Sequence, residues 1–79
     1  PTFRVFPDPS AGPVTVVFPR MEDTITITVR DMLGRELQRV RATTTHAVTL
    51  DLAALPDGRY LMDAMTGHQR TVRVVTIGR

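Results

Sequence analysis

Cysteine is absent from this 79-residue sequence, which excludes a disulfide framework, a thiolate metal site and a thiol nucleophile. Tryptophan is also absent, and carbohydrate-binding surfaces commonly use exposed tryptophan or tyrosine rings, so glycan binding is weakly supported. No apolar run approaches the roughly 18 residues that a transmembrane helix needs. We therefore expect no direct insertion into a membrane.

Lysine and asparagine are missing too, and all ten basic residues are arginines. A biased base composition or the avoidance of heat-labile amides explains this pattern, and neither points to a function. The net charge is +2, but the arginines are spread along the chain and alternate with acids. Nucleic-acid surfaces show clustered positive charge and stacking aromatics, so no nucleic-acid partner is expected.

The short chain limits what the protein can be. A domain of this length buries roughly 60% of the surface of its unfolded chain, so its core is thin. Little room is left for a ligand pocket of several hundred Å³, which disfavours an enzyme. We expect one domain over residues 1–79, and because the first residue is Pro1 rather than methionine, we expect it to be part of a longer polypeptide.

Short segments of alternating polarity follow one another, separated by turn residues at intervals of about 8 to 12 residues. The expected strands are residues 3–6, 14–18, 24–30, 35–41, 48–52, 59–65 and 71–77. No strand-helix-strand spacing is visible, which argues against a parallel sheet. The pattern predicts an all-β fold, an immunoglobulin-like antiparallel β-sandwich of about seven strands.

Three of these strands carry specific expectations. Residues 24–30 are nearly all β-branched and alternate with a period of two, as in a half-buried strand. Residues 35–41 break the alternation, which indicates an edge strand with a bulge, or alternatively a short amphipathic helix. In the last strand, Val72 and Val74 are expected to face the core and Arg73 to face solvent.

The segment before Tyr60 is expected to form a corner. Immunoglobulin-like domains carry a tyrosine near the start of the sixth strand, and its hydroxyl bonds to upstream backbone. Met62 stands two residues later, where antibody domains have a cysteine. A methionine there fills core volume without a cross-link.

No residue pattern indicates catalysis, a metal site or a cofactor. His46 and His68 lack further ligands at metal-binding spacing and are expected in exposed loops. Ser10, the only serine, lies in a proline-rich turn and is expected to cap that turn.

The aspartates are also expected to be structural. Asp8, Asp31 and Asp57 each precede a turn, where the side chain can accept backbone hydrogen bonds. Asp51 and Asp63 are expected to point outward from strands and to pair with neighbouring arginines as ordinary surface charges.

Three motifs in order give the sequence a family resemblance. Residues 6–12, FPDPSAG, resemble the Y/F-P-N-P-x-x-G opening of the type A C-terminal sorting domain of the type IX secretion system. Residues 29–35, VRDMLGR, resemble its V-x-D-x-x-G-R/K hairpin, and residues 51–60, DLAALPDGRY, resemble its D-L-S-x-L-P-x-G-x-Y segment. Residues 72–79 resemble its apolar and basic terminal strand. The resemblance covers essentially the whole chain.

The resemblance marks a set of motif residues as candidates for recognition. They are Pro7, Asp8, Pro9, Gly12, Asp31, Gly34, Arg35, Leu55, Pro56, Gly58, Tyr60, Val74 and Arg79. The chain departs from the family pattern at Asp8, which replaces asparagine, and at Ala53, which replaces a small polar residue. Arginine also replaces lysine near the end, which keeps the charge but changes the geometry.

The resemblance implies a role without chemistry of its own. Such domains lie at the C-terminus of secreted proteins and direct their covalently linked cargo from the periplasm across the outer membrane to the cell surface or the medium. The implied partners are the type IX translocon and a sortase-like protease that removes the domain. The final strand, with Arg79 at its end, is expected to be presented to the translocon by strand addition.

A second class of function stays open. The chain could be an accessory β-sandwich of a surface enzyme, acting as a spacer or as a weak carbohydrate-binding module. Exposed aromatic residues in a groove would favour this reading. The oligomeric state is open as well, because an unpaired edge such as residues 35–41 can support a dimer.

Overall fold

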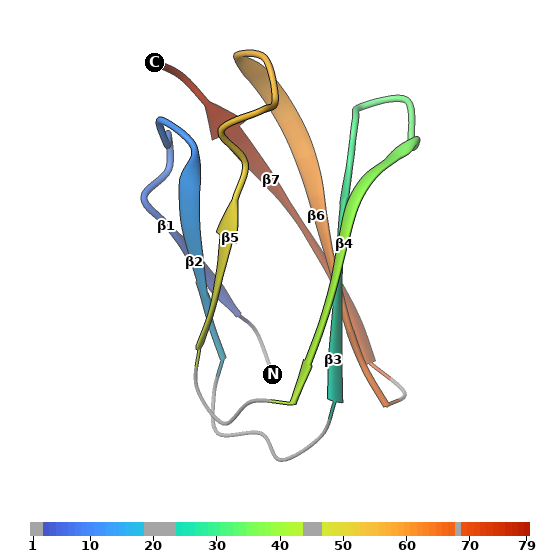
Figure 1. Cartoon of the computed structure of the whole chain (residues 1–79). Helices are drawn as coiled ribbons and strands as arrows, with labels where there is room; N and C mark the ends of the chain where they lie inside the picture. Colours follow the sequence, from blue (N-terminus) through green and yellow to red (C-terminus); the bar gives the residue numbers. More distant parts are fainter. Residues whose placement is uncertain (1–2, 19–23, 44–46, 68) are drawn as a thin grey trace.

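The computed structural model describes residues 3–18, 24–43, 47–67 and 69–79. The strands in these residues are β1 (Arg4–Phe6), β2 (Pro13–Val17), β3 (Thr24–Arg30), β4 (Glu36–Thr43), β5 (Ala47–Asp51), β6 (Gly58–Thr66) and β7 (Gln69–Ile77). They form two antiparallel sheets, β1-β2-β5 and β4-β3-β6-β7, which pack face to face (Figure 1). This confirms the all-β, immunoglobulin-like sandwich expected from the sequence.

The strand order differs from that of a constant-type immunoglobulin domain in one respect. In such a domain the fourth strand pairs in the sheet of the first, second and fifth strands. Here β4 pairs with β3, so it lies at the edge of the four-stranded sheet. β7 forms the other edge of that sheet. The four-stranded sheet therefore offers a broad outer face.

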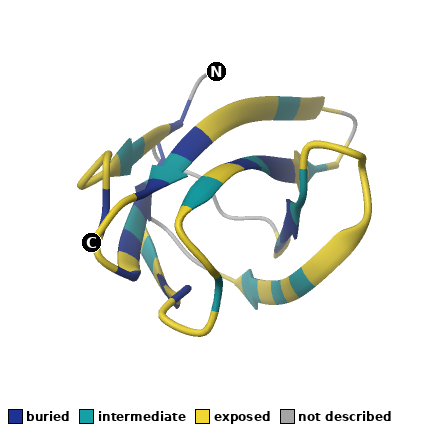
Figure 2. Cartoon of the chain, turned by 90° about the horizontal axis from the view of Figure 1, so that it is seen from above, coloured by how far each residue is buried: buried dark blue, intermediate teal, exposed yellow. Residues whose placement is uncertain are grey.

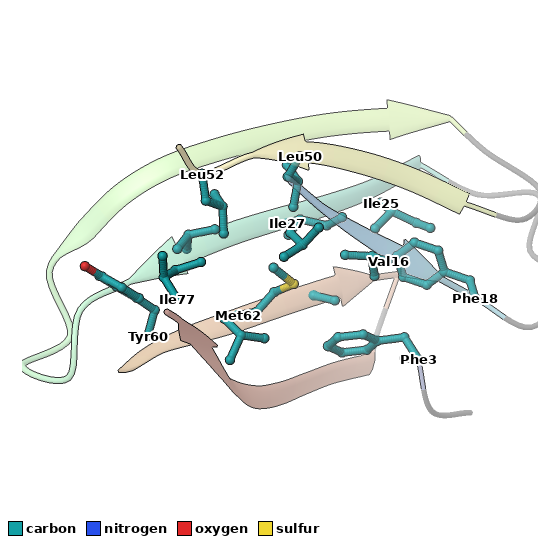
Figure 3. Packing of buried hydrophobic residues seen from close by; sticks show 14 residues of the cluster. Phe3, Val16, Phe18, Ile25, Ile27, Leu50, Leu52, Tyr60, Met62 and Ile77 are labelled. Atoms are coloured by element: carbon teal, nitrogen blue, oxygen red, sulfur yellow. The ribbon is translucent and has the colours of Figure 1, made fainter. Parts of the chain in front are cut away.

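The core lies between the two sheets and is built from alternate residues of each strand. Met62 is fully buried at its centre, as its position after the tyrosine predicted (Figure 3). Phe3 and Phe18 pack at one end of the core with ring centroids 5.9 Å apart. Viewed from above, the buried residues line the space between the sheets and the exposed ones lie outside it (Figure 2).

The β3–β4 hairpin confirms the bulge and the edge position predicted for residues 35–41. Val29 pairs with Gln38 and Arg30 pairs with Glu36, so Leu37 is the extra residue. This explains why the apolar spacing of residues 35–41 departs from two. The alternative of a helix is wrong, because this segment is part of β4.

The predicted facing of Val72 and Val74 in the last strand is wrong. Val72 and Val74 are 46% and 42% exposed on the outer face, while Val75 and Ile77 are buried in the core. Arg73 is exposed, as predicted, although its register position opposite Met62 lies on the inner side of β7 and its guanidinium is 5.5 Å from the centroid of the Phe3 ring. The run VRVVTI carries apolar residues in both phases, and the phase adopted places Val75 and Ile77 in the core between the two sheets.

A few expectations concern residues whose structure is not described. The predicted polar turn at 19–23 and both histidines, His46 and His68, lie outside the described residues. In the described part of the chain, three or more histidine, cysteine or acidic side chains nowhere gather as a metal site would require. Among the same residues, no helix is long and apolar enough to cross a membrane.

Candidate functional site

The residues marked by the sequence motifs gather at one end of the sandwich. The β1–β2, β3–β4 and β5–β6 connections and the C-terminus all lie at this end (Figure 1). We call it the motif end and define it by residues 7–13, 31–35, 52–60 and 76–79. Among the predicted motif residues, Val74 alone lies outside it, on the outer face of β7.

The first turn is held by Ser10, which is buried. Its hydroxyl donates to the Pro13 carbonyl over 2.6 Å and accepts from the Gly12 amide over 3.0 Å. Ser10 therefore caps the turn, as predicted. Gly12 has a φ of 150°, and a Cβ there would lie 3.0 Å from the Cα of Ala53. The two turns approach so closely that a side chain at Gly12 has no space.

The same turn fastens the end of the last strand. The Ser10 amide donates to the Thr76 carbonyl over 2.9 Å, and the Gly78 amide donates to the Ser10 carbonyl over 2.8 Å. The Asp8 carboxylate accepts a third bond, from the Thr76 amide, at 2.9 Å. Asp8 thus bonds backbone 68 residues away, not backbone of its own turn as the sequence suggested. These bonds tie the two sheets together at this edge.

The C-terminal Arg79 is held by the β5–β6 connection. Its guanidinium donates to the Asp57 carboxylate over 2.7 Å and to the Ala53 carbonyl over 2.7 Å. Its backbone amide also donates to the Asp57 carboxylate, over 3.2 Å. The bond from the Arg79 amide is the main reason that the pKa of Asp57 is lowered from 3.8. Arg79, which the sequence suggested as a free recognition group, is therefore engaged inside the domain. We call these contacts, together with those of Ser10 and Asp8, the C-terminal clasp.

The tyrosine corner is present beside the clasp. The Tyr60 hydroxyl donates to the Pro56 carbonyl, and the ring is only 7% exposed. Leu55 packs against the core, and its amide closes the turn by donating to the Leu52 carbonyl over 3.0 Å. Gly58 begins β6 and pairs with Ile77 of β7. The corner and the last strand therefore support each other.

The β3–β4 hairpin forms a separate group at the motif end. The Asp31 carboxylate accepts the amides of Leu33 and Arg35, each at 2.9 Å, and the Arg35 Nε at 2.6 Å. The Arg35 amide contributes most to lowering the pKa of Asp31 from 3.8. Gly34 adopts a φ of 90°, as a tight turn requires. The fixed turn leaves Leu33 85% exposed at its tip.

Two further motif residues flank the first turn. The peptide bonds before Pro7 and Pro9 are both cis. The Pro9 ring lies against Gly78, since a Cβ at Gly78 would be 3.8 Å from the Pro9 Cβ. Pro9 thus packs against the same C-terminal segment that the clasp holds.

Sequence reasoning missed one buried charge. Asp63 is 5% exposed, although it points away from the core, and was predicted to be an ordinary surface residue. Arg70 donates to its Oδ2 through Nε over 2.8 Å and through Nη2 over 2.7 Å, and Arg30 Nε lies 3.7 Å from the same oxygen. The outward direction and the pairing with arginines were predicted; only the burial was not, because β6 lies inside the sheet, between β3 and β7.

The fold and the motif end define a class of small immunoglobulin-like sandwich whose motifs close one end around the last strand. Compared with models of known families, residues 4–78 match the secretion system C-terminal sorting domain. The chain belongs to this family, the C-terminal sorting domains of type IX secretion. No curated protein matches the sequence.

Membership of the family has consequences for the role of the chain. A type IX sorting signal implies linkage to an upstream cargo, contact with the secretion machinery, and export to the cell surface or the extracellular space. Families of sorting signals are not normally catalytic.

Proposed function

We propose that residues 1–79 form a single, non-catalytic signal domain that carries its cargo from the periplasm across the outer membrane through the type IX translocon. A sortase-like protease then separates the domain from the cargo. The proposal rests on the family match over residues 4–78.

The observation that carries the mechanism is the C-terminal clasp. Two turns far apart in the sequence, around Ser10 and Asp57, hold the last strand and Arg79 in the fold. A signal that is recognised as a flexible peptide would not need bonds that fix the last residues in the fold. The clasp therefore supports a signal that is read as a folded unit, whose motif end is complete only when Gly78 and Arg79 are in place.

The clasp also limits which part of β7 is open to strand addition by the translocon. β7 is an edge strand, and Thr76 near its end and Gly78 just after it already bond to Ser10. Strand addition by a partner would therefore use the part of β7 before Thr76. Arg79 acts by completing the domain rather than by contacting the translocon.

The test is a fusion of residues 1–79 to the C-terminus of a red fluorescent reporter with a periplasmic signal, in a host with type IX machinery. We expect reporter at the surface or in the medium, and retention in the periplasm in a translocon-deficient strain. A second fusion lacks Gly78 and Arg79, and we expect it to be retained in the periplasm with a lowered melting temperature. Secretion of the truncated fusion at the full rate would contradict the role of the clasp.

Retention of the intact fusion in both strains would contradict the sorting function and favour the accessory sandwich. The structure gives that alternative little support. Phe6, on the outer face of β1, is 49% exposed, while Phe3, Phe18 and Tyr60 are buried. One exposed ring does not make the aromatic platform that glycan binding commonly uses.

A further inference from the structure

The outer face of the four-stranded sheet collects half of the arginines of the chain. Strand register places the outward side chains in rows across the sheet, so that Arg41 of β4 lies opposite Thr26, and Thr26 opposite Met65. The arginines on this face are Arg30, Arg39, Arg41, Arg59 and Arg70. We call it the arginine face.

The acids on the arginine face do not balance this charge. Of the described residues, two acids, Asp63 and Glu36, lie on it, so the described part of this face has a formal charge of +3 from five arginines and two acids, whereas the whole chain carries +2. The outer face of the three-stranded sheet carries Arg4 and Asp51, which cancel. The positive charge of the protein is therefore concentrated on one side.

Part of this charge is held in place and part is free. Asp63 holds Arg70 by two bonds to one oxygen and lies 3.7 Å from Arg30. Among the described residues, Arg41 and Arg59 are exposed and have no ion-pair partner. The face thus presents uncompensated guanidinium groups on β4 and on β6, on either side of β3.

An apolar patch lies within the same face, on β6 and β7. Met65, Val72 and Val74 are 47%, 46% and 42% exposed, and Leu61 is half-buried opposite Val74. The register places Leu61 opposite Val74 and Asp63 opposite Val72, so the buried carboxylate of Asp63 lies between Leu61 and Met65 within this patch. An apolar centre with methionine and a rim of arginine is the composition of a protein-protein interface.

We propose that the arginine face docks onto an acidic protein surface of the type IX machinery that has a small apolar centre. This proposal rests on the proposed function. Complementary charge would steer the domain to its partner, and arginine suits carboxylates because its planar guanidinium can bond both oxygens.

Other occupants fit the face less well. A second copy of the chain would bring +3 against +3, so face-to-face pairing is repulsive. A lipid surface is normally met by tryptophan, phenylalanine or leucine side chains that enter the acyl region. The apolar residues of the patch are two valines, a methionine and the half-buried Leu61 on a sheet, and among the described residues no aromatic ring lies on this face.

The test reverses the two unpaired arginines. The fusion protein with Arg41→Glu and Arg59→Glu is compared with one that carries Arg4→Glu. Arg4 is exposed on the opposite sheet and has no ion-pair partner within the described residues. The probe is the type IX translocon purified in detergent and immobilised, with binding measured at low and high salt. Melting temperatures of all variants are measured first, because these exposed sites should leave the fold intact.

We expect the double variant to lose at least about tenfold in translocon binding and in secretion rate, since reversing two charges at an interface removes attraction and adds repulsion. Wild-type binding should weaken as salt rises. The Arg4→Glu fusion should match the wild type in both assays.

Three results would overturn the proposal. The first is wild-type binding and secretion of the double variant. The second is failure of the wild-type fusion to bind the translocon although it is secreted. The third is salt-sensitive binding of the fusion to vesicles of phosphatidylethanolamine and phosphatidylglycerol that is lost in the double variant, which would assign the face to a lipid surface. If the wild-type fusion is not secreted at all, the sorting function itself fails, which is a different outcome from these three.

Discussion

Replacing Tyr60 by phenylalanine tests whether the corner stabilises the fold. The change removes only the hydroxyl that donates to the Pro56 carbonyl and keeps the ring, which is 7% exposed. A hydrogen bond contributes about 1 kcal/mol net, and an acceptor left partly buried adds to the loss. We expect a destabilisation of about 1 to 2 kcal/mol, which in a domain of this size lowers Tm by roughly 5 to 15 °C.

The assay is thermal and urea unfolding of the isolated reporter fusion, followed through the far-UV signal of the domain after subtraction of the reporter. Thr49→Val is the matched control, because it also removes one hydroxyl but from an exposed Thr15–Thr49 contact of 3.4 Å. The control should change stability by less than about 0.5 kcal/mol. Equal stability of the Tyr60 variant and the wild type would refute the structural role assigned to the corner.

Three further predictions concern stability. Gly12→Val should destabilise the domain by about 2 to 4 kcal/mol in urea unfolding, because the new Cβ would meet Ala53 at 3.0 Å and the φ of residue 12 is strained for a side chain. The control is Gly34→Ala, where the Cβ meets open space. A smaller loss of stability for Gly12→Val than for this control would argue against the contact. Asp63→Asn should cost about 1 to 3 kcal/mol, because Arg30 and Arg70 lose the charge they share; an unchanged midpoint would contradict it. Stability should fall as the pH drops below about 4, because the pKa values of Asp31 and Asp57 are lowered from 3.8 in the fold, so the unfolded chain binds more protons. The double variant Asp31→Asn and Asp57→Asn should show a flatter dependence of stability on pH over the same range. A dependence as steep as that of the wild type would count against this role of the two carboxylates.

The strands with one dominant phase could be predicted from the sequence. In residues 24–30 the isoleucines and Val29 occupy every second position, and the structure gives the same bounds for β3. The bulge at Leu37 was also visible, because local spacing reports a local irregularity. In β7, by contrast, Val72, Val74 and Val75 support both phases, and only the packing of the two sheets in the folded domain decides which of them are buried.

The candidate site was predictable in part. The motifs identified the residues of the motif end, but not their partners, because the clasp joins positions far apart in the sequence. Asp8 bonds Thr76 across 68 residues, and Arg79 bonds Asp57 across 22. Local patterns carry no information on such pairs. The arginine face was missed for the same reason, since its arginines alternate with other residues and gather only when β3, β4, β6 and β7 align.

The most direct measurement of the central claim is the fraction of fusion protein that an added protease can reach on intact cells and in the medium. It is compared between a host with the type IX translocon and an isogenic host without it. The account predicts that most of the fusion is accessible in the first host and almost none in the second, with equal expression in both. Equal accessibility in the two hosts, or none in either, would contradict the assignment of this domain as a type IX sorting signal.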